Sequence, residues 1–519
     1  MKEKHFLNLS SEIPKLSKNE ADQLKGGFKK VATKPSVQMS GDINKNCHGN
    51  SGDAGSDEDG DANVNCKFSC KFSSIKTKFT ILVQVITKQY IIMKWSLYNF
   101  IIRNGSDYLL YNSLTNELMA CVGGINSLLN EYKNNMDELK QIHSELYNYL
   151  DAQKFIVSDE TDEAKQFIEH QKATDTSNDS LRIIINPTLD CNLRCWYCYE
   201  KHREGSTIHN DVDLAIKTFI KKEIEDKSLK SLSLSFFGGE PLMHFRKQVL
   251  PLILYTKELC ITHKVKLKCS FTTNAVLLTP NVTELLANTK LEYHFQVPFD
   301  GDRDFHDSIK KHPNGTGTYD TVLQNVKYAA SKGFAFTIRC NYTDKNILSF
   351  KKAIDDLSNI DSKENLVFSL QRIWQEEDSS ELDNKEKEML LYLRNKGLTK
   401  PTEYKGIFQC YADKENCIVI NYNGDIYKCT ANDFLPEKKE GILNSNGVIT
   451  YNSLYEKRMK AKYALKPCLE CNILPICMIC TQKRLKMINE EKCIYIKEKD
   501  KPDIIRDHIR RIYKETDIT

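Results

Sequence analysis

The sequence has little excess charge and no long hydrophobic run. Its 519 residues carry 74 basic and 70 acidic side chains, a formal net charge of +4, so the charge balance does not call for nucleic acid or an anionic membrane as partner. The one apolar candidate for a membrane segment, residues 79–92, is interrupted by Lys88 and Gln89 and is too short to span a bilayer. Residues 1–9 lack the apolar core of a secretory signal. We therefore expect a cytoplasmic protein with neither a membrane nor a nucleic acid as partner.

Cysteine, by contrast, is abundant. The chain holds 18 cysteines in an otherwise ordinary composition, 40% hydrophobic and 28% charged. In a reducing cytoplasm, clustered cysteines are metal ligands or catalytic groups more often than disulfides. The length leaves room for about two to four domains.

The first cysteine cluster follows a β-like apolar run at residues 181–185. Cys191, Cys195 and Cys198 have the spacing C-x3-C-x2-C. Three thiolates can hold three irons of a [4Fe–4S] cluster and leave the fourth iron open to another ligand, whereas a closed cluster needs four thiolates. A zinc knuckle is the alternative, since zinc takes four N or S ligands and Glu200 or His202 could supply the fourth.

This spacing resembles the cluster motif of the radical S-adenosylmethionine (SAM) superfamily. The resemblance implies that the open iron chelates SAM through its amino and carboxylate groups. It also implies that an electron from the cluster cleaves SAM to a 5′-deoxyadenosyl radical.

Beyond residue 181 the pattern alternates between strand and helix. Strand-like runs lie at 181–185, 232–237, 266–272, 293–297, 334–339 and 366–370, and helical periodicity lies between them, for example at 212–225, 320–332 and 348–357. Such alternation predicts an α/β fold of parallel βα units. Six units are fewer than the eight of a closed barrel, and the resemblance implies a partial (βα)6 barrel of the TIM type. Chemistry in such barrels lies at the carboxyl ends of the strands.

The second strand is followed by Gly238, Gly239, Glu240 and Pro241. Two glycines allow close approach of the backbone to a ligand, and a carboxylate there can accept from an ammonium group. The run resembles the GGEP motif of the superfamily, which implies binding of the SAM amino group. An ordinary Gly-Gly turn is the alternative.

Three further residues end later strands. Asn274 lies in Thr-Asn-Ala, where the family commonly has Thr-Asn-Gly, and Ala275 departs from that pattern. Asp300 matches the Asp-Gly of the family and is expected to receive a ribose hydroxyl. Arg339, near Asn341, is expected to meet the SAM carboxylate. A structural role remains open for each of them.

The carboxyl-terminal part holds eight more cysteines, enough for two closed [4Fe–4S] clusters with four thiolates each or for a pair of zinc ribbons. The pattern resembles the SPASM auxiliary-cluster domain. That resemblance implies a first cluster on Cys410, Cys417, Cys429 and Cys480, and a second on Cys468, Cys471, Cys477 and Cys493. Two residues separate Cys477 from Cys480, whereas the family usually has three.

The amino-terminal part has a different sequence pattern from the rest of the chain. Residues 1–74 resemble a ribosomal peptide precursor, with a double-glycine leader ending at Gly27 and a short core containing Cys66 and Cys70. The tract at 41–65 is too polar to offset its ordering entropy, so we expect disorder. A flexible tail is the alternative. Met93 is a plausible internal start. It opens a region with two strands, at 93–102 and 108–115, and a helix at 124–151.

These patterns predict five segments: a precursor-like tail at 1–92, a small α+β region at 93–175, a radical SAM barrel at 176–400, a SPASM domain at 401–500 and a terminal helix at 501–519. The resemblance implies a SAM-dependent peptide maturase with three [4Fe–4S] clusters, a precursor peptide as substrate (in cis if residues 1–74 are that peptide) and flavodoxin or ferredoxin as electron donor. A thioether cross-link is the expected product, and no catalytic side chain is identified.

Two other functions remain. An anaerobic sulfatase-maturase type would oxidise Cys or Ser to formylglycine, and it uses an Asp directly after the third SPASM cysteine. That position is Thr430 here, and the nearest downstream carboxylate is Asp433. A non-catalytic iron–sulfur carrier or zinc-bound scaffold is the second alternative, and it would not need the SAM-binding motif.

Overall fold

The structure, a computed structural model, describes residues 92–121, 123–176, 179–376, 379, 381–398 and 410–513. The prediction of a disordered, precursor-like tail therefore lies almost wholly outside the described residues. The chain forms two compact units. One contains the described residues up to Glu163, Cys471–Pro475 and the chain from Lys501 onward. The other contains Ala164–Glu470 and Ile476–Asp500.

The first unit is built from small antiparallel sheets and short helices. Its three-stranded sheet has the order β2 (Asn99–Asn104), β3 (Asp107–Asn112), β4 (Leu118–Cys121), and β1 (Met93–Trp95) pairs with β5 (Ile156–Ser158). Its helices are α3 (Gly123–Tyr132), α4 (Met136–Ile142), α5 (Ser144–Ala152) and α17 (Lys501–Tyr513). The expected strand 93–102 is two strands, and β4 was not anticipated.

The helix predicted at 124–151 is three helices, because two side chains cap new helix starts inside it. The Asn135 side chain accepts from the backbone N–H of Glu138 at 3.3 Å, and His143 Nδ1 accepts from the N–H of Leu146 at 3.2 Å. An N-cap satisfies a backbone donor that would otherwise have no partner in the first turn. The breaks allow Leu129, Leu139 and Leu150, one from each helix, to enter the same core.

The second unit is organised around a ten-stranded sheet of order β11-β10-β9-β8-β7-β6-β12-β13-β14-β15. The first six strands of that order are parallel, as predicted, and form an open sheet rather than a closed barrel. The strands are β6 (Ser180–Ile185), β7 (Ser231–Phe236), β8 (Lys266–Thr272), β9 (Glu292–Phe299), β10 (Ala335–Tyr342), β11 (Leu366–Arg372), β12 (Cys417–Ile420), β13 (Asp425–Tyr427), β14 (Gly441–Leu443) and β15 (Ile449–Tyr451).

The cysteine-rich tail extends this same sheet. Strand β12 pairs in parallel with β6, with Cys417 opposite Arg182 and Ile420 opposite Ile185. Strands β13 to β15 continue as an antiparallel meander. The sequence indicated a hairpin here but not its attachment to the barrel strand that leads into the first cysteine motif.

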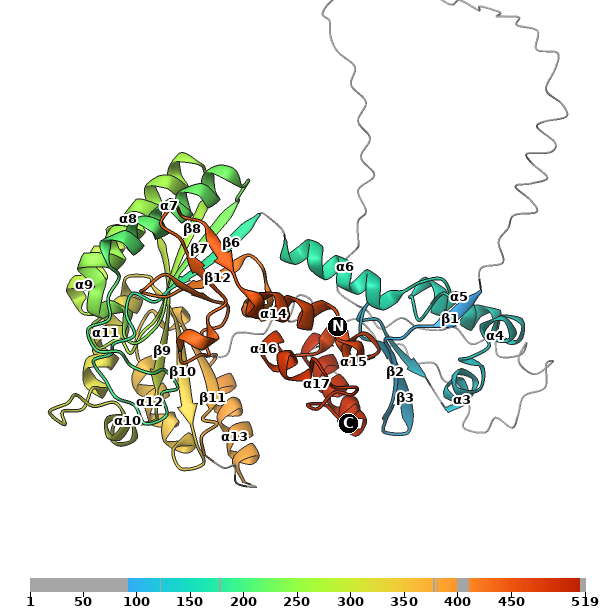
Figure 1. Ribbon diagram of the computed structural model, residues 1–519. Helices are drawn as coiled ribbons and strands as arrows, with labels where there is room; N and C mark the ends of the chain where they lie inside the picture. The colour runs from blue at the N-terminus through green and yellow to red at the C-terminus, as the bar shows by residue number, and fades with distance from the viewer. Residues whose placement is uncertain are drawn as a thin grey trace, which may run out of the picture. The chain divides into compact units, whose positions relative to one another are not determined.

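Helices cover the outer face of the parallel strands (Figure 1). In chain order the helices of this unit are α6 (Glu163–Asp175), α7 (Asn210–Asp226), α8 (Leu250–Thr262), α9 (Pro280–Ala287), α10 (Arg303–Ile309), α11 (Tyr319–Ser331), α12 (Phe350–Ser358), α13 (Leu382–Asn395), α14 (Ser453–Tyr463), α15 (Lys466–Leu469) and α16 (Thr481–Arg484). No helix in the described ranges is long and apolar enough to cross a membrane.

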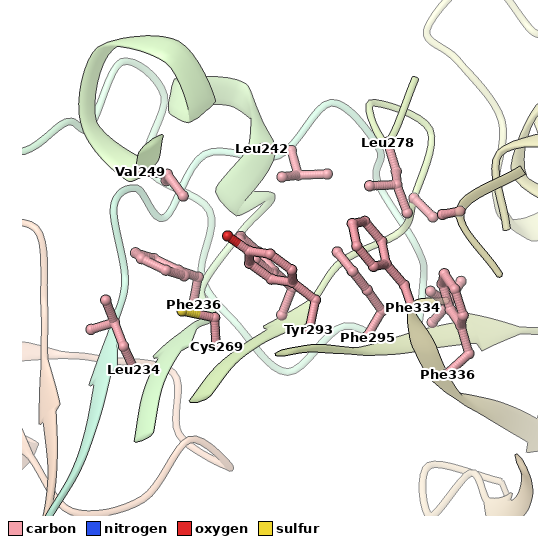
Figure 2. Close-up of a cluster of buried hydrophobic side chains, with 14 of the residues drawn as sticks. Leu234, Phe236, Leu242, Val249, Cys269, Leu278, Tyr293, Phe295, Phe334 and Phe336 are labelled. Atoms are coloured by element: carbon pink, nitrogen blue, oxygen red, sulfur yellow. The ribbon is translucent and has the colours of Figure 1, made fainter. Parts of the chain in front are cut away.

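Alternation along the strands separates an apolar outer face from a polar inner one. On the outer face, Phe271 stacks with Phe236 and Phe295 at ring-centroid distances of 5.0 and 5.1 Å, and Phe336 lies 5.3 Å from Phe295. Figure 2 shows Phe236, Phe295 and Phe336 among the buried side chains of this layer. The intervening residues, such as Ser235 and Ser270, line a cavity. The sheet thus supplies a rigid wall with polar groups directed inward.

Candidate active site

The inner face of the sheet lines a cavity of about 1290 Å³ that is partly open to solvent. Its lining combines the ends of the barrel strands with the cysteine-rich tail. The lining residues named by the sequence motifs are Cys191, Cys195, Cys198, Gly239, Asn274, Arg339 and Cys429. Motifs that lie far apart in the chain therefore meet at one site, as expected for the carboxyl ends of parallel strands.

The first cysteine motif forms an irregular loop after β6, and polar side chains hold it in place. Asp190 accepts from the backbone N–H of Cys191 at 2.8 Å and from that of Gly205 at 3.1 Å. Thr188 Oγ1 accepts from the N–H of Asp190 at 2.8 Å. The loop is thus fixed at its start, and its three thiols line one cavity.

The surroundings of these thiols fit a cluster ligand set. The backbone N–H of Leu193 lies 3.5 Å from Cys191 Sγ, and Asn274 Nδ2 lies 3.8 Å from it. Such donors favour ligated sulfurs and tune a cluster. Burial raises the pKa of all three thiols, that of Cys198 to about 11, so a bound metal would have to displace their protons.

The Gly-Gly turn is required by a close approach within the protein itself. Gly238 and Gly239 have φ of +80° and +48°, and a Cβ on Gly239 would lie 2.0 Å from the carbonyl oxygen of Asp190. The N–H of Gly239 donates to Glu200 at 2.9 Å, and the N–H of Glu240 donates to the carbonyl of Asp190 at 2.8 Å. The glycines therefore dock this turn against the cysteine loop.

Glu240 is completely buried, and its carboxylate accepts three hydrogen bonds. The donors are the N–H of Leu242 at 3.0 Å, Thr273 Oγ1 at 2.7 Å and the N–H of Asn274 at 2.8 Å. Burial raises the Glu240 pKa to about 7 despite these donors. Pro241 begins a short 3₁₀ turn, Pro241–His244, that Glu240 caps. Glu240 thus ties the second strand end to the third, and its bond to the SAM ammonium stays a prediction.

Asn274 and Ala275 form the third strand end. Asn274 Nδ2 donates to Asn192 Oδ1 at 2.8 Å, which links this strand end to the cysteine loop. Ala275 is buried and has φ of +62°. The position where the family has glycine thus keeps the left-handed backbone that glycine favours.

Ala275→Gly should therefore stabilise the protein by about 1 kcal/mol, because glycine adopts this conformation without steric strain. Urea unfolding of the metal-free protein measures the effect. Ala329→Gly, at a buried helical position in α11, is the control and should destabilise by about 1 kcal/mol. Equal losses in both variants would contradict the strain argument.

Asp300 is engaged by other side chains. It forms an ion pair with Lys310, and Tyr197 Oη donates to its Oδ1 at 2.7 Å. Arg339 lines the cavity and donates through Nε to Asn341 Oδ1 at 2.9 Å. Contacts of Asp300 with a ribose and of Arg339 with the SAM carboxylate remain predictions. Sequence reasoning did not single out Lys310, which carries no motif.

The first predicted auxiliary set gathers around the tail meander. Cys410 precedes a short turn, Cys417 begins β12, Cys429 follows β13 and Cys480 directly precedes α16. Burial is the main cause that raises the thiol pKa of Cys410, Cys417 and Cys429. The neighbouring thiols add to it: Cys429 and Cys480 raise the pKa of Cys410, Cys480 raises that of Cys429, and Cys429 raises that of Cys417. Their ligation of a cluster stays a prediction.

The second predicted set is divided between the two units, because Cys471 belongs to the first unit and the other three to the second. In the second unit, Cys468 and Cys477 both interact electrostatically with the buried Arg484, and Cys493 lies at the edge of a small core around Met487. Among the described residues, no three His, Cys, Asp or Glu side chains form a site for a single metal ion.

The first carboxylate after Cys429 in the chain, Asp433, is paired with a lysine rather than left as a base. Both oxygens of Asp433 pair with Lys438, at 2.8 and 2.7 Å. Burial raises the Asp433 pKa, but Lys438 together with backbone N–H groups outweighs burial, so the pKa is lowered. Thr430, directly after Cys429, hydrogen-bonds with the Tyr411 hydroxyl.

Residues 185–357 match the sequence model of the Radical SAM superfamily, and this part of the chain is a radical SAM domain. Among curated proteins, the chain is 25% identical over 285 residues to the radical SAM cyclopropyl synthase TigE of Paramaledivibacter caminithermalis, covering 49% of this chain and 59% of that protein. It is 25% identical over 175 residues to the serine-type anaerobic sulfatase-maturating enzyme of Bacteroides thetaiotaomicron, covering 32% of this chain and 40% of that enzyme.

Among solved structures, SuiB of Streptococcus suis bound to S-adenosylmethionine matches with a TM-score of 0.44 and 17% identity, over 77% of this chain and 97% of that chain. The two curated relatives are matched over only part of their length: the chain spans about three-fifths of the first and two-fifths of the second. A radical SAM domain implies a [4Fe–4S] cluster and SAM, and the three thiols and their donors fit that cluster.

Proposed function

We propose that this protein is a radical SAM/SPASM enzyme that modifies a ribosomally made peptide. The observation that carries the proposal is the shared cavity, whose wall includes both the first cysteine motif and Cys429 of the tail. Its volume of about 1290 Å³ exceeds the roughly 300–1,000 Å³ typical of small-ligand sites. It can therefore hold SAM and part of a larger substrate together.

In this function Cys191, Cys195 and Cys198 hold the cluster, and Glu240, Asn274 and Arg339 orient SAM. When reduced, such a cluster supplies the electron that cleaves SAM to the 5′-deoxyadenosyl radical. The protein surrounds that reaction with the wall of the sheet and the tail, which limits access of water and other reactants.

We further propose that the modification is a thioether cross-link, and that the auxiliary sets bind two more clusters. One hydrogen atom leaves the attacked carbon to form 5′-deoxyadenosine. The thiol would lose a proton and one electron, and auxiliary clusters held by the tail cysteines would accept that electron. Flavodoxin or ferredoxin is the proposed donor of the electron that cleaves SAM. The product has one new C–S bond and two hydrogens fewer than the substrate.

The substrate is proposed to be carried in cis by residues 1–74, with Cys66 or Cys70 as the sulfur donor. Tethering gives effective concentrations of about millimolar order. Incubating the full chain anaerobically with SAM and a reductant should lower the mass of digest fragments spanning residues 28–76 by two hydrogens per cross-link. A Cys66→Ala/Cys70→Ala variant, the matched control, should keep its fragment masses. Unchanged masses in the parent, with deoxyadenosine formed from an added peptide, would contradict the cis arrangement.

Residues of the same site bear on two alternative functions. A formylglycine-forming enzyme is favoured by the sulfatase-maturating relative. Against it, Thr430 stands directly after Cys429, where such an enzyme has its Asp base, and Asp433 is paired with Lys438. An iron–sulfur carrier or zinc scaffold would not cleave SAM, so formation of deoxyadenosine excludes it.

A further inference from the structure

A buried lysine lies behind the first cysteine loop. The Lys310 side chain is 2% exposed, lines the cavity beside Cys195 and forms an ion pair with Asp300, which is 0% exposed. Its Nζ also donates to Tyr197 Oη at 2.5 Å. Tyr197 stands between Cys195 and Cys198 in the motif, so the lysine is linked directly to the loop that carries the three thiols.

The position of this lysine is fixed from several sides. Lys310 ends α10, where its N–H donates to the carbonyl of His306 at 2.7 Å and its carbonyl accepts from Thr318 Oγ1 at 2.5 Å. Asn341 Nδ2 donates to Tyr197 Oη at 3.1 Å and so holds the phenol. A buried ammonium that lost these partners would be strongly destabilising.

The ion pair presents its positive end to the cavity. Lys310 lines the same cavity as Cys195 and Cys198, whereas Asp300 is not among the residues of that lining. The ammonium group therefore lies on the thiol side of the pair. A fixed positive charge near an iron–sulfur cluster favours the reduced form, which carries one more negative charge.

We propose that Lys310 raises the reduction potential of the cluster held by Cys191, Cys195 and Cys198, and that Asp300 and Tyr197 hold its ammonium group against the cysteine loop. Lys310 is a positioning and tuning residue rather than a catalytic one, because it acts through the cluster. The proposal concerns the cluster alone and can be tested without any peptide substrate.

The test is an anaerobic titration of the reconstituted full chain with dithionite, followed by EPR. The relevant cluster is the one whose EPR signal changes when SAM is added. Lys310→Met should lower the reduction potential of this cluster by about 59 mV. That shift corresponds to about a tenfold smaller equilibrium constant for one-electron reduction. Asp300→Asn should raise the potential, because the lysine charge loses its counter-charge. Lys345→Met removes an exposed lysine paired with Glu376 and should change nothing.

If the Lys310–Asp300 pair has only a structural role, Lys310→Met and Asp300→Asn should shift the reduction potential in the same direction. That result would overturn the proposal. An unshifted potential in Lys310→Met with full iron content would also overturn it. If Lys310→Met does not retain iron, the double variant Lys310→Met/Asp300→Asn avoids an unpaired buried charge. Its potential should still fall, and a value equal to the parent's would refute the assignment. If the double variant also loses iron, the test is Asp300→Asn alone. A raised reduction potential supports the proposal, and an unchanged or lowered one contradicts it.

Discussion

Replacing Cys191, Cys195 and Cys198 together with alanine should remove about four of roughly twelve irons bound after anaerobic reconstitution, since each cubane contains four. It should also abolish SAM cleavage. The three thiols lie on one short loop that Asp190 and Thr188 hold in place through backbone N–H groups, so alanine leaves that framework intact. Iron content and 5′-deoxyadenosine formation are the two measurements.

The matched control is Cys260→Ala, which removes a buried thiol from α8, outside all three predicted ligand sets. It should keep the iron content and the cleavage activity of the parent. A parent protein that binds stoichiometric zinc and no iron would contradict the cluster assignment. A triple variant with unchanged iron would place the cluster elsewhere.

The Glu240→Gln variant should bind SAM roughly 10- to 100-fold more weakly while retaining its iron. A carboxylate paired with an ammonium contributes about 1.5–3 kcal/mol, and about 1.4 kcal/mol corresponds to tenfold in affinity. Isothermal titration with SAM under anaerobic conditions measures the change. Iron analysis separates loss of SAM affinity from loss of the cluster.

The structure adds a control for this variant, because Glu240 also accepts from Thr273 and from two backbone N–H groups. Thr273→Val removes one of these donors without changing the charge. If SAM binding depends on the carboxylate charge, Thr273→Val should affect affinity much less than Glu240→Gln. Equal losses in the two variants would mean that Glu240 acts by holding the strand ends together, and unchanged affinity in Glu240→Gln would contradict the ammonium assignment.

The site has a layered organisation that follows from the sheet. Polar residues on the inner face, such as Ser235 and Gln296, line the cavity. Stacked phenylalanines such as Phe295 and Phe336 belong to the apolar core. Loops at the strand ends then bond to one another, as Gly239 does to Glu200 and Asn274 to Asn192. Chemistry at the site therefore depends on loops that are anchored to a rigid sheet and to each other.

The alternating pattern determined much of the fold without tertiary information. Each predicted strand after residue 180 is present, and the parallel βα order is confirmed, because the periodicities of 2 and 3.6 residues are local properties of buried strands and helices. In the first unit the sequence prediction failed where short-range caps compete with periodicity, since Asn135 and His143 each start a new helix. The attachment of β12 to β6 was also missed, because pairing of strands so distant in the chain has no local signature.

For the site, the local sequence was enough to identify which residue types stand at the strand ends, because C-x3-C-x2-C and Gly-Gly-Glu-Pro are contiguous motifs whose spacing is set by the chain. The contacts of those residues depend on how the chain folds. Folding brings Lys310 to Tyr197 and Asp300 and docks the turn at Gly239 on Asp190. The physical reason is that a lysine without a motif looks like any surface lysine until folding buries it, when the cost of desolvation requires a partner.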